Sequence, residues 1–397
     1  MKMNQRIMRI ALAAFFLVML FPLWGHLFPQ PEVESLEENR TMTEWSFSGT
    51  LKNRIGTLED YLNDHLAFRQ SAISAVLRAN LVLGESPHEL VASGLDGWLF
   101  YMTGTEDLRN GGIIEEETLR ELYDTQQAVS DTFAAAGADY RILLAPDKST
   151  VYSRYLPLSC RMGSGPSSVD QMLTAPGPEY SVRFIDVRPA LIRAAEGESP
   201  QYYKTDSHWN TNGALTACQA LIDGLLPEHP SIRRLTEADL VYGEETASGD
   251  LAAMIGQKGI MTDRYTGVSV RGASFRKDPD RSDGTFTVMV NDALPDAPRL
   301  LLIHDSFGDA LVPFLRECFS EVWLMSNDGA SFAAMGDLSR FDIVVYELVE
   351  RNRSWLWTGI SGGPGEDGEY DDEYDEYYDD EYYEYDVEDE DFGEYGE

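Results

Sequence analysis

The fold of this chain is decided by one stretch, Arg299-Leu300-Leu301-Leu302-Ile303-His304-Asp305-Ser306-Phe307-Gly308. Its short, continuous apolar run is typical of a strand buried inside a sheet, and the residues after Gly308 have the apolar spacing of a helix. A serine in such a turn lies at the carboxyl end of its strand, where α/β sheets bind ligands. We therefore predict that Ser306 is a nucleophile, with the backbone amides of Ser306 and Gly308 as candidate donors to an oxyanion.

Strand-like and helical segments alternate along the whole central part of the chain. We expect strands at 98–101, 140–144, 183–187, 299–303, 321–325 and 342–348, and helices at 116–136, 214–226 and 308–319. This alternation predicts an α/β fold in which helices cover both faces of a mostly parallel sheet. The segment 235–298 interrupts the pattern with several glycines and short Val/Tyr runs, and we expect surface loops or a small β excursion there.

An acid and an imidazole stand almost a hundred residues before the serine, in Tyr203-Lys204-Thr205-Asp206-Ser207-His208-Trp209-Asn210. A serine hydroxyl becomes a good nucleophile when a neutral imidazole takes its proton, and that imidazole needs a carboxylate to fix its tautomer and stabilise its charge. Asp206 and His208 are two residues apart, so their side chains point the same way in an extended or turning segment. The sequence thus predicts a catalytic triad of Asp206, His208 and Ser306.

Six other residues are candidates for secondary roles: Trp209, Tyr203 and Lys148 as substrate contacts, and Asn210, Glu347 and Arg351 as structural supports. The face of Trp209 suits the apolar side of a pyranose, although a tryptophan can equally belong to the core. Lys148 follows an expected strand on the carboxyl side of the sheet, where it could contact substrate or form an ion pair. For Glu347 and Arg351 we favour an ion pair that closes the domain.

Metal binding by Asp206, His208 and His304 is an alternative reading of the same residues. It lacks the H-E-x-x-H or C-x-x-C spacing that would support a metal centre, so we expect neither a metal nor another cofactor. Cys218 and Cys318 fall on the apolar faces of expected helices, where a thiol packs as a small hydrophobe, and Cys160 lies in a loop. Three cysteines cannot all pair, so the sequence implies no disulfide framework.

The two motifs resemble those of the SGNH-hydrolase-like polysaccharide O-acetyltransferases of the alginate acetylation type, often called DHHW-type proteins. The family's hallmark is a D-x-H-W stretch that precedes a D-S-F turn, and Asp206-Ser207-His208-Trp209 and Asp305-Ser306-Phe307 match it in that order. The likeness covers about residues 37 to 355 and includes Gly249-Asp250-Leu251. One departure is His304, which stands where many SGNH serine turns carry glycine. It would either crowd the turn or place a second imidazole near the site.

The resemblance implies an SGNH/flavodoxin-like domain that transfers acetyl groups to hydroxyls of an extracytoplasmic polysaccharide. Ser306 would carry the acetyl group as an ester, His208 would act as base and then as acid, and Asp206 would orient His208. The resemblance also implies a partner, a membrane-bound O-acyltransferase that delivers the acyl group across the bilayer. Two alternatives remain open: an extracellular carbohydrate esterase with the same triad, and a non-catalytic protein that binds or scaffolds surface polysaccharide.

The N-terminus predicts a membrane anchor. Lys2, Arg6 and Arg9 precede a nearly continuous apolar run over residues 10–28, and about 19 residues at 1.5 Å each come close to crossing a hydrocarbon core of roughly 30 Å. The positive-inside bias keeps residues 1–9 in the cytoplasm and the catalytic domain outside the cell membrane. A cleaved signal peptide is the competing interpretation, but the run lacks an A-x-A-like exit.

Charge excludes one class of partner and defines the tail. The net charge is −37, and 19 acidic residues without a single Lys or Arg lie between Glu366 and Glu397. The rest of the chain still has 49 acids against 31 bases, so nucleic acid is an improbable ligand. We predict a stalk with amphipathic helices at 29–88, a catalytic domain at 89–360, and a disordered, Tyr-rich acidic tail at 361–397.

Overall fold

The computed structural model describes residues 88–103, 113–157, 160, 165–272 and 274–360, together with Phe16. Apart from Phe16, these residues belong to one compact unit, Gln70–Gly365. The predicted cytoplasmic flank, nearly all of the anchor and the stalk, and the acidic tail lie outside the described residues. Among the helices that are described, none has both the length and the apolar character of a membrane span.

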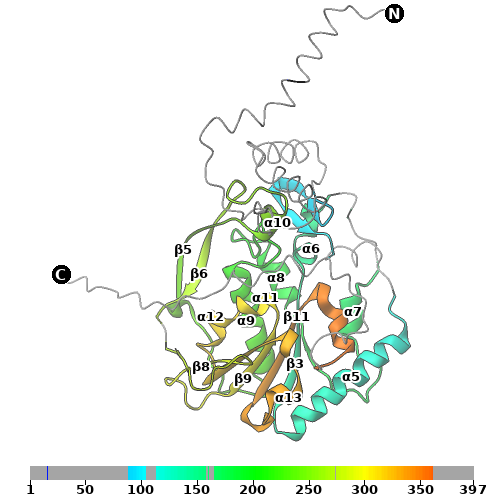
Figure 1. Cartoon of the computed structure of the whole chain (residues 1–397), viewed down its shortest axis with the longest axis vertical. Helices are drawn as coiled ribbons and strands as arrows, with labels where there is room; N and C mark the ends of the chain where they lie inside the picture. The colour runs from blue at the N-terminus through cyan, green and yellow to red at the C-terminus, as the bar shows by residue number, and fades with distance from the viewer. Residues whose placement is uncertain are drawn as a thin grey trace, which may run out of the picture. The chain divides into compact units, whose positions relative to one another are not determined.

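A seven-stranded mixed sheet forms the centre of the described part (Figure 1). Its order is β4 (Phe184–Ile185), β3 (Asp139–Ala145), β11 (Ile343–Val349), β9 (Arg299–His304), β10 (Glu321–Ser326), β8 (Thr287–Val290) and β7 (Arg276–Lys277). The first five strands run parallel, as predicted, whereas β8 and β7 pair antiparallel at the β10 edge. The sheet is therefore mixed, because the 235–298 segment supplies two strands to it.

The central strands read as continuous apolar runs because both of their faces are covered. Every residue of β11 is buried, as are the four apolar residues of β9. Alternate side chains of β9 enter different cores: Leu300 and Leu302 belong to one apolar cluster, and Leu301 and Ile303 belong to the other. This two-residue alternation is what a strand between two helical layers requires.

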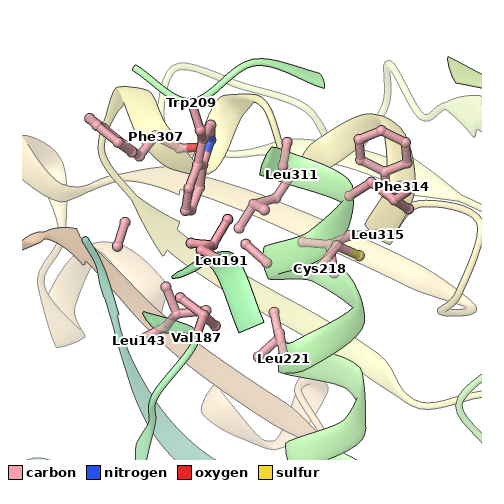
Figure 2. Packing of buried hydrophobic residues seen from close by; sticks show 14 of the residues in the cluster. Leu143, Val187, Leu191, Trp209, Cys218, Leu221, Phe307, Leu311, Phe314 and Leu315 are labelled. Carbon is pink, nitrogen blue, oxygen red and sulfur yellow. The ribbon is translucent and has the colours of Figure 1, made fainter. Parts of the chain in front are cut away.

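Helices from different parts of the chain close the two faces. On one face, α5 (Glu116–Ala135) and α7 (Ser168–Met172) contribute to the cluster that contains Leu301. On the other, α8 (Arg188–Ala194) and α9 (Thr211–Leu225) contribute to the cluster that contains Leu300. Figure 2 shows side chains of α8 and α9 converging with Leu143 of β3. Cys218 and Cys318 are buried in this second cluster, as predicted.

Three expected elements differ from the structure. The segment 98–101 forms β2 (Leu99–Tyr101), which pairs with β1 (Val91–Ser93) in a separate hairpin instead of joining the main sheet. The expected helix at 308–319 is divided into α11 (Ser306–Asp309) and α12 (Val312–Leu315). Pro313 stands at the start of α12, and a proline cannot donate the backbone hydrogen bond that would continue the preceding helix. The strand expected at 183–187 is reduced to the two residues of β4.

The remaining elements lie mostly in connections, and the β excursion expected within 235–298 is the hairpin of β5 (Leu240–Ala247) and β6 (Asp263–Val270). The short helices are α6 (Lys148–Val151), α10 (Asp250–Met254) and α13 (Phe332–Met335). The 3-10 turns are η1 (Leu95–Gly97), η3 (Ser153–Tyr155), η5 (Glu237–Asp239), η6 (Asn327–Gly329), η7 (Leu338–Arg340) and η8 (Glu350–Trp357). Several of these connections meet beyond the carboxyl ends of β3, β9 and β11.

Candidate active site

The turn that carries Ser306 is held in place by the residue before it. Asp305 caps α11, because one carboxylate oxygen accepts a hydrogen bond from the Phe307 amide at 2.9 Å. Its other oxygen accepts one from the Val349 amide at 2.7 Å, which ties the turn to the end of the neighbouring strand β11. Ser306 itself is exposed. The nucleophile candidate is therefore fixed in its backbone and accessible at its hydroxyl.

Asp206, His208 and Ser306 form a continuous chain of contacts. The Nε2 atom of His208 lies 2.8 Å from the Ser306 hydroxyl, although the two residues are 98 positions apart in the sequence. On the other side of the ring, Nδ1 lies 2.7 Å from Oδ1 of Asp206, which also accepts the His208 amide at 2.8 Å. This is the acid–imidazole–hydroxyl geometry that activates a serine nucleophile.

The charges of the pair stabilise each other. Burial disfavours the Asp206 carboxylate, but the charge and hydrogen bonds of His208 outweigh this effect and lower the pKa of Asp206 to about 2. Burial likewise opposes a charge on His208, yet the Asp206 carboxylate prevails and raises the pKa of His208 above its usual value. The site therefore favours an imidazolium, the species that forms when His208 takes a proton from the serine.

Lys148 has a different role from the predicted substrate contact. Its side chain is buried, with 3 % exposure, and Nζ donates hydrogen bonds to the carbonyl oxygens of Tyr203, Lys204 and Asp206. The first two of these bonds measure 3.1 and 3.3 Å. Burial lowers the pKa of Lys148 to about 8. Lys148 thus fastens the backbone of the segment that presents Asp206 and His208, and it is not available to a substrate.

Trp209 is also placed differently from the predicted sugar subsite. It is only 1 % exposed, so it has no open face on which a pyranose could lie. Its indole N–H donates to the Phe307 carbonyl at 3.0 Å, and the two rings meet edge to face with centroids 5.1 Å apart (Figure 2). The Phe307 ring in turn lies 4.8 Å from the His208 ring. Trp209 therefore joins the two segments of the site from within the core.

Tyr203 remains a candidate contact at the rim of the site. It is half-buried, and its hydroxyl oxygen lies 3.2 Å from the hydroxyl oxygen of Tyr265 in β6, within hydrogen-bond reach. Tyr265 also donates to Glu245 of β5. The β5–β6 hairpin therefore reaches the segment that carries Asp206 and His208.

The two predicted oxyanion donors have different surroundings. The Ser306 amide is the first of α11, and within the described residues no group accepts a hydrogen bond from it. The Gly308 amide donates to the Asp305 carbonyl at 3.0 Å, and its role as an oxyanion donor stays a prediction. Glycine is needed at 308 for space, because a Cβ atom there would lie 2.3 Å from Cβ of His304.

The three predicted supports all lie beneath the site, but their partners differ from expectation. Asn210 caps α9, because its side-chain oxygen accepts the amides of Asn212 and Gly213. Arg351 pairs with Asp147 at 2.6 Å and not with Glu347. Glu347 is fully buried and accepts the Asp305 amide at 3.2 Å, and burial raises its pKa well above the usual range. Arg351 thus forms an ion pair, as expected, but its partner is Asp147 and not Glu347.

Sequence reasoning missed Asp250 as a site residue. Its carboxylate lies 3.7 Å from Nδ1 of His208 and accepts hydrogen bonds from Ser207. The one signal was the Gly249-Asp250-Leu251 stretch, which belonged to the family resemblance and carried no assigned role. Phe307, which contacts both Trp209 and His208, was likewise assigned no role beyond its place in the D-S-F motif.

The three residues considered for metal binding, Asp206, His208 and His304, do not all come together in the structure. Within the described ranges, the His304 ring nitrogen Nδ1 lies 2.9 Å from the Asp305 carbonyl and 3.7 Å from the Asp309 carboxylate. The group of side chains whose polar atoms come within 4.8 Å of one another is instead Asp206, His208 and Asp250. These atoms already make the hydrogen bonds of the acid–imidazole arrangement.

One comparison with known proteins identifies the family of this chain. A family model described as an SGNH hydrolase-like domain, acetyltransferase AlgX, matches residues 91–338, which is more than half of the chain. No curated protein sequence matches the chain. Several solved structures are similar to it. PatB1 of Bacillus cereus with a sulfonyl adduct is 14 % identical at a TM-score of 0.48, with coverage of 65 % of this chain and 93 % of that chain.

Two further solved structures have comparable figures. The O-acetyltransferase domain of Pseudomonas putida AlgJ is 18 % identical at a TM-score of 0.43, and the match covers 68 % of this chain and 93 % of that one. A DHHW family protein from Eubacterium siraeum is 15 % identical at a TM-score of 0.47, and the match covers 68 % of this chain and 99 % of that one.

Proposed function

We propose, from the premise that this chain belongs to the AlgX family of SGNH hydrolase-like acetyltransferases, that it transfers acetyl groups to hydroxyls of an extracytoplasmic polysaccharide through an ester on Ser306. The observation that carries the proposal is the chain of contacts from Asp206 through His208 to the exposed Ser306 hydroxyl, at 2.7 and 2.8 Å. Both distances are within hydrogen-bond reach, as proton transfer requires.

In the acylation half of the reaction, Nε2 of His208 takes the proton of the Ser306 hydroxyl as Oγ attacks the carbonyl carbon of the acetyl donor. The negative charge that develops on the carbonyl oxygen faces the Ser306 amide, the proposed oxyanion donor. The bond to the leaving group then breaks, and the imidazolium gives its proton to that group. Asp206 holds the tautomer of His208 in which Nε2 can accept a proton.

In the second half, a hydroxyl of the acceptor takes the place of the leaving group. His208 removes the proton of that hydroxyl, whose oxygen attacks the acetyl–Ser306 ester. The ester bond to Oγ breaks, Ser306 recovers its proton from His208, and the acetylated acceptor leaves. The rim around Tyr203 and the β5–β6 hairpin is the proposed position of the acceptor.

The proposal includes a location and a partner. Residues 10–28 would anchor the chain in the cell membrane with residues 1–9 inside, and the catalytic domain at 89–360 would lie outside, between the stalk and the acidic tail. The acetyl donor would come from a membrane-bound O-acyltransferase. The apolar run and its basic flank support the anchor, and the partner follows from the resemblance.

Two other functions compete with this proposal. The contacts of His208 with both Asp206 and Ser306 argue against a non-catalytic scaffold, because a scaffold has no need for this hydrogen-bonded arrangement. A carbohydrate esterase would use the same contacts and transfer the acetyl group to water. The two enzymes differ in what removes the acetyl group from Ser306.

We expect a polysaccharide acceptor to accelerate loss of the acetyl group from the enzyme. The full-length chain in detergent is loaded with p-nitrophenyl acetate, and the adduct is followed by intact-mass analysis with and without a panel of polysaccharides. In a transferase, the right polymer shortens the lifetime of the adduct and becomes acetylated. Release of free acetate at one rate, whatever polymer is present, would assign the esterase function instead.

We expect protease added to intact cells or spheroplasts to digest the catalytic domain, because the basic flank keeps the N-terminus inside. An antibody against the domain detects the digestion, and a cytoplasmic protein serves as the control for lysis. Protection of the domain until the cells are broken would reverse the proposed topology and separate the enzyme from its polysaccharide.

A further inference from the structure

A second acidic residue meets the Asp206–His208 segment from a distant part of the chain. Asp250 is the first residue of α10, and its carboxylate accepts both hydrogen bonds that Ser207 can donate. The Ser207 amide reaches Oδ1 at 2.7 Å, and the Ser207 hydroxyl reaches Oδ2 at 2.5 Å. In return, the Asp250 amide donates to Oδ2 of Asp206 at 3.1 Å. Three hydrogen bonds therefore join two segments that are more than 40 residues apart.

We propose that Asp250 is a positioning residue that locks the Asp206–His208 segment in its reactive arrangement and places a second negative charge beside the imidazole. This inference rests on the function proposed for Ser306, His208 and Asp206. Asp250 touches no reacting atom in this scheme. It acts through Ser207, the residue between the acid and the base, and through its charge.

The hydrogen bonds explain how the lock works. The two oxygens of Asp206 have separate tasks: Oδ1 accepts the amide and ring nitrogen of His208, and Oδ2 accepts the Asp250 amide. With Oδ2 held, the carboxylate cannot rotate away from the ring. Ser207 is held at both its amide and its hydroxyl, so the backbone between Asp206 and His208 cannot turn independently of α10.

Gly249 makes the close approach of the two segments possible. A Cβ atom at this position would lie 2.2 Å from Cβ of Asp206 and 2.5 Å from its Cα, distances that no side chain can occupy. The Gly249 amide also donates to the Thr205 hydroxyl at 3.1 Å. Gly249 thus leaves room for the Asp206 backbone, and Asp250 accepts the hydrogen bonds of Ser207.

Several charged groups face His208. Asp206 and Asp250 favour its protonated form, and Arg351 opposes it. The charge of Asp309 also interacts with the ring. Oδ2 of Asp250 is 3.7 Å from Nδ1, close enough for its charge to matter in a partly buried site. Removing that charge destabilises the imidazolium and makes His208 a weaker base.

The test measures the protonation of His208 directly, because this does not depend on the enzyme's activity. In the full-length chain with ¹³C-labelled histidine, each of the six histidines gives a ring signal, and His208→Gln assigns the one of interest. We expect Asp250→Asn to lower the pKa of His208 by about one unit. In the pH profile of kcat/KM, the acidic limb should move to lower pH by the same amount. The maximum value of kcat/KM, on the plateau above this limb, should fall about 10- to 100-fold.

Two further variants separate charge from position. Asp250→Glu keeps the charge but moves the carboxylate, so we expect the pKa of His208 to stay near the wild-type value while the plateau activity falls. Asp296→Asn removes the same charge from an exposed site that makes no contact with the triad, and it should change neither quantity. The thermal unfolding of each variant is compared with that of the wild type to confirm that the variant is folded.

The outcomes are distinct. A His208 titration in Asp250→Asn that superimposes on the wild type would overturn the proposal, as would a loss of activity with an unmoved acidic limb. If the wild type forms no adduct at Ser306, the proposed function fails, and the titration of His208 still decides whether Asp250 controls the imidazole.

Discussion

We expect Ser306→Ala to abolish the acetyl adduct of the full-length chain and to lower its turnover of p-nitrophenyl acetate by about 10³-fold or more. The reason is chemical: in the proposed reaction the Ser306 oxygen forms the bond to the acetyl carbon, and alanine has no atom to replace it. Intact-mass analysis should show one acetyl group on the wild type and none on the variant. Removal of the hydroxyl leaves the backbone of the turn unchanged, because Asp305 holds that turn through the amides of Phe307 and Val349.

Ser326→Ala is the matched control for this experiment. Ser326 is an exposed serine at the end of the neighbouring strand β10, and it lies opposite His304 in the sheet register. Its removal should leave the adduct intact, and EDTA should do the same, because no step of the proposed chemistry uses a metal. An adduct that persists in Ser306→Ala would refute the assignment of the nucleophile. Activity that disappears with EDTA would favour the metal reading.

The second large effect is expected for His208→Gln, which should lower kcat/KM about 10²- to 10⁴-fold by removing the general base. The wild-type rate should also depend on pH in a defined direction. Only neutral imidazole accepts a proton, and the pKa of His208 is raised by Asp206. Activity therefore increases as pH rises through a value above 6.5, the usual pKa of histidine, and this limb should be absent from the variant.

His304→Gln distinguishes this base from the other imidazole near the turn. His304 immediately precedes Asp305, and its Nδ1 atom faces the Asp305 carbonyl, whereas His208 points Nε2 at the serine. Glutamine retains the Cβ atom against which Gly308 packs. We expect a loss far smaller than that of His208→Gln. Equal losses in the two variants would mean that the base has been assigned to the wrong histidine.

The parts of the site that the sequence could predict are those with a local signal. The apolar run before Ser306 and the two-residue spacing of Asp206 and His208 depend on neighbours in the sequence. The alternation of strands and helices placed Ser306 at the carboxyl edge of the sheet, and the chemistry of a triad together with the family resemblance linked Asp206 and His208 to it. The structure does place them together there, while the chemical roles of the three residues remain to be tested by the variants above.

The parts that could not be predicted depend on packing between distant segments. Whether Trp209 faces a ligand or the core is decided by Phe307, which lies 98 residues further on. Lys148 becomes a backbone fastener only because the turn at 203–206 places three carbonyl oxygens around its ammonium group. Asp250 comes from a segment whose pattern indicated loops, and its hydrogen bonds to Ser207 have no counterpart in local spacing.

The position of β11 in the sheet has a consequence for the newly made protein. This strand is the last of the described strands to be synthesised, yet it lies between β3 and β9 and pairs with both. Lys148, which fastens the Asp206–His208 segment, follows β3, and Ser306 follows β9. A chain released before residue 343 would contain every member of the triad but not the strand that joins its two halves. We therefore expect a chain that ends before residue 343 to lack the proposed acyl-transfer activity, because β3 and β9 would not be joined.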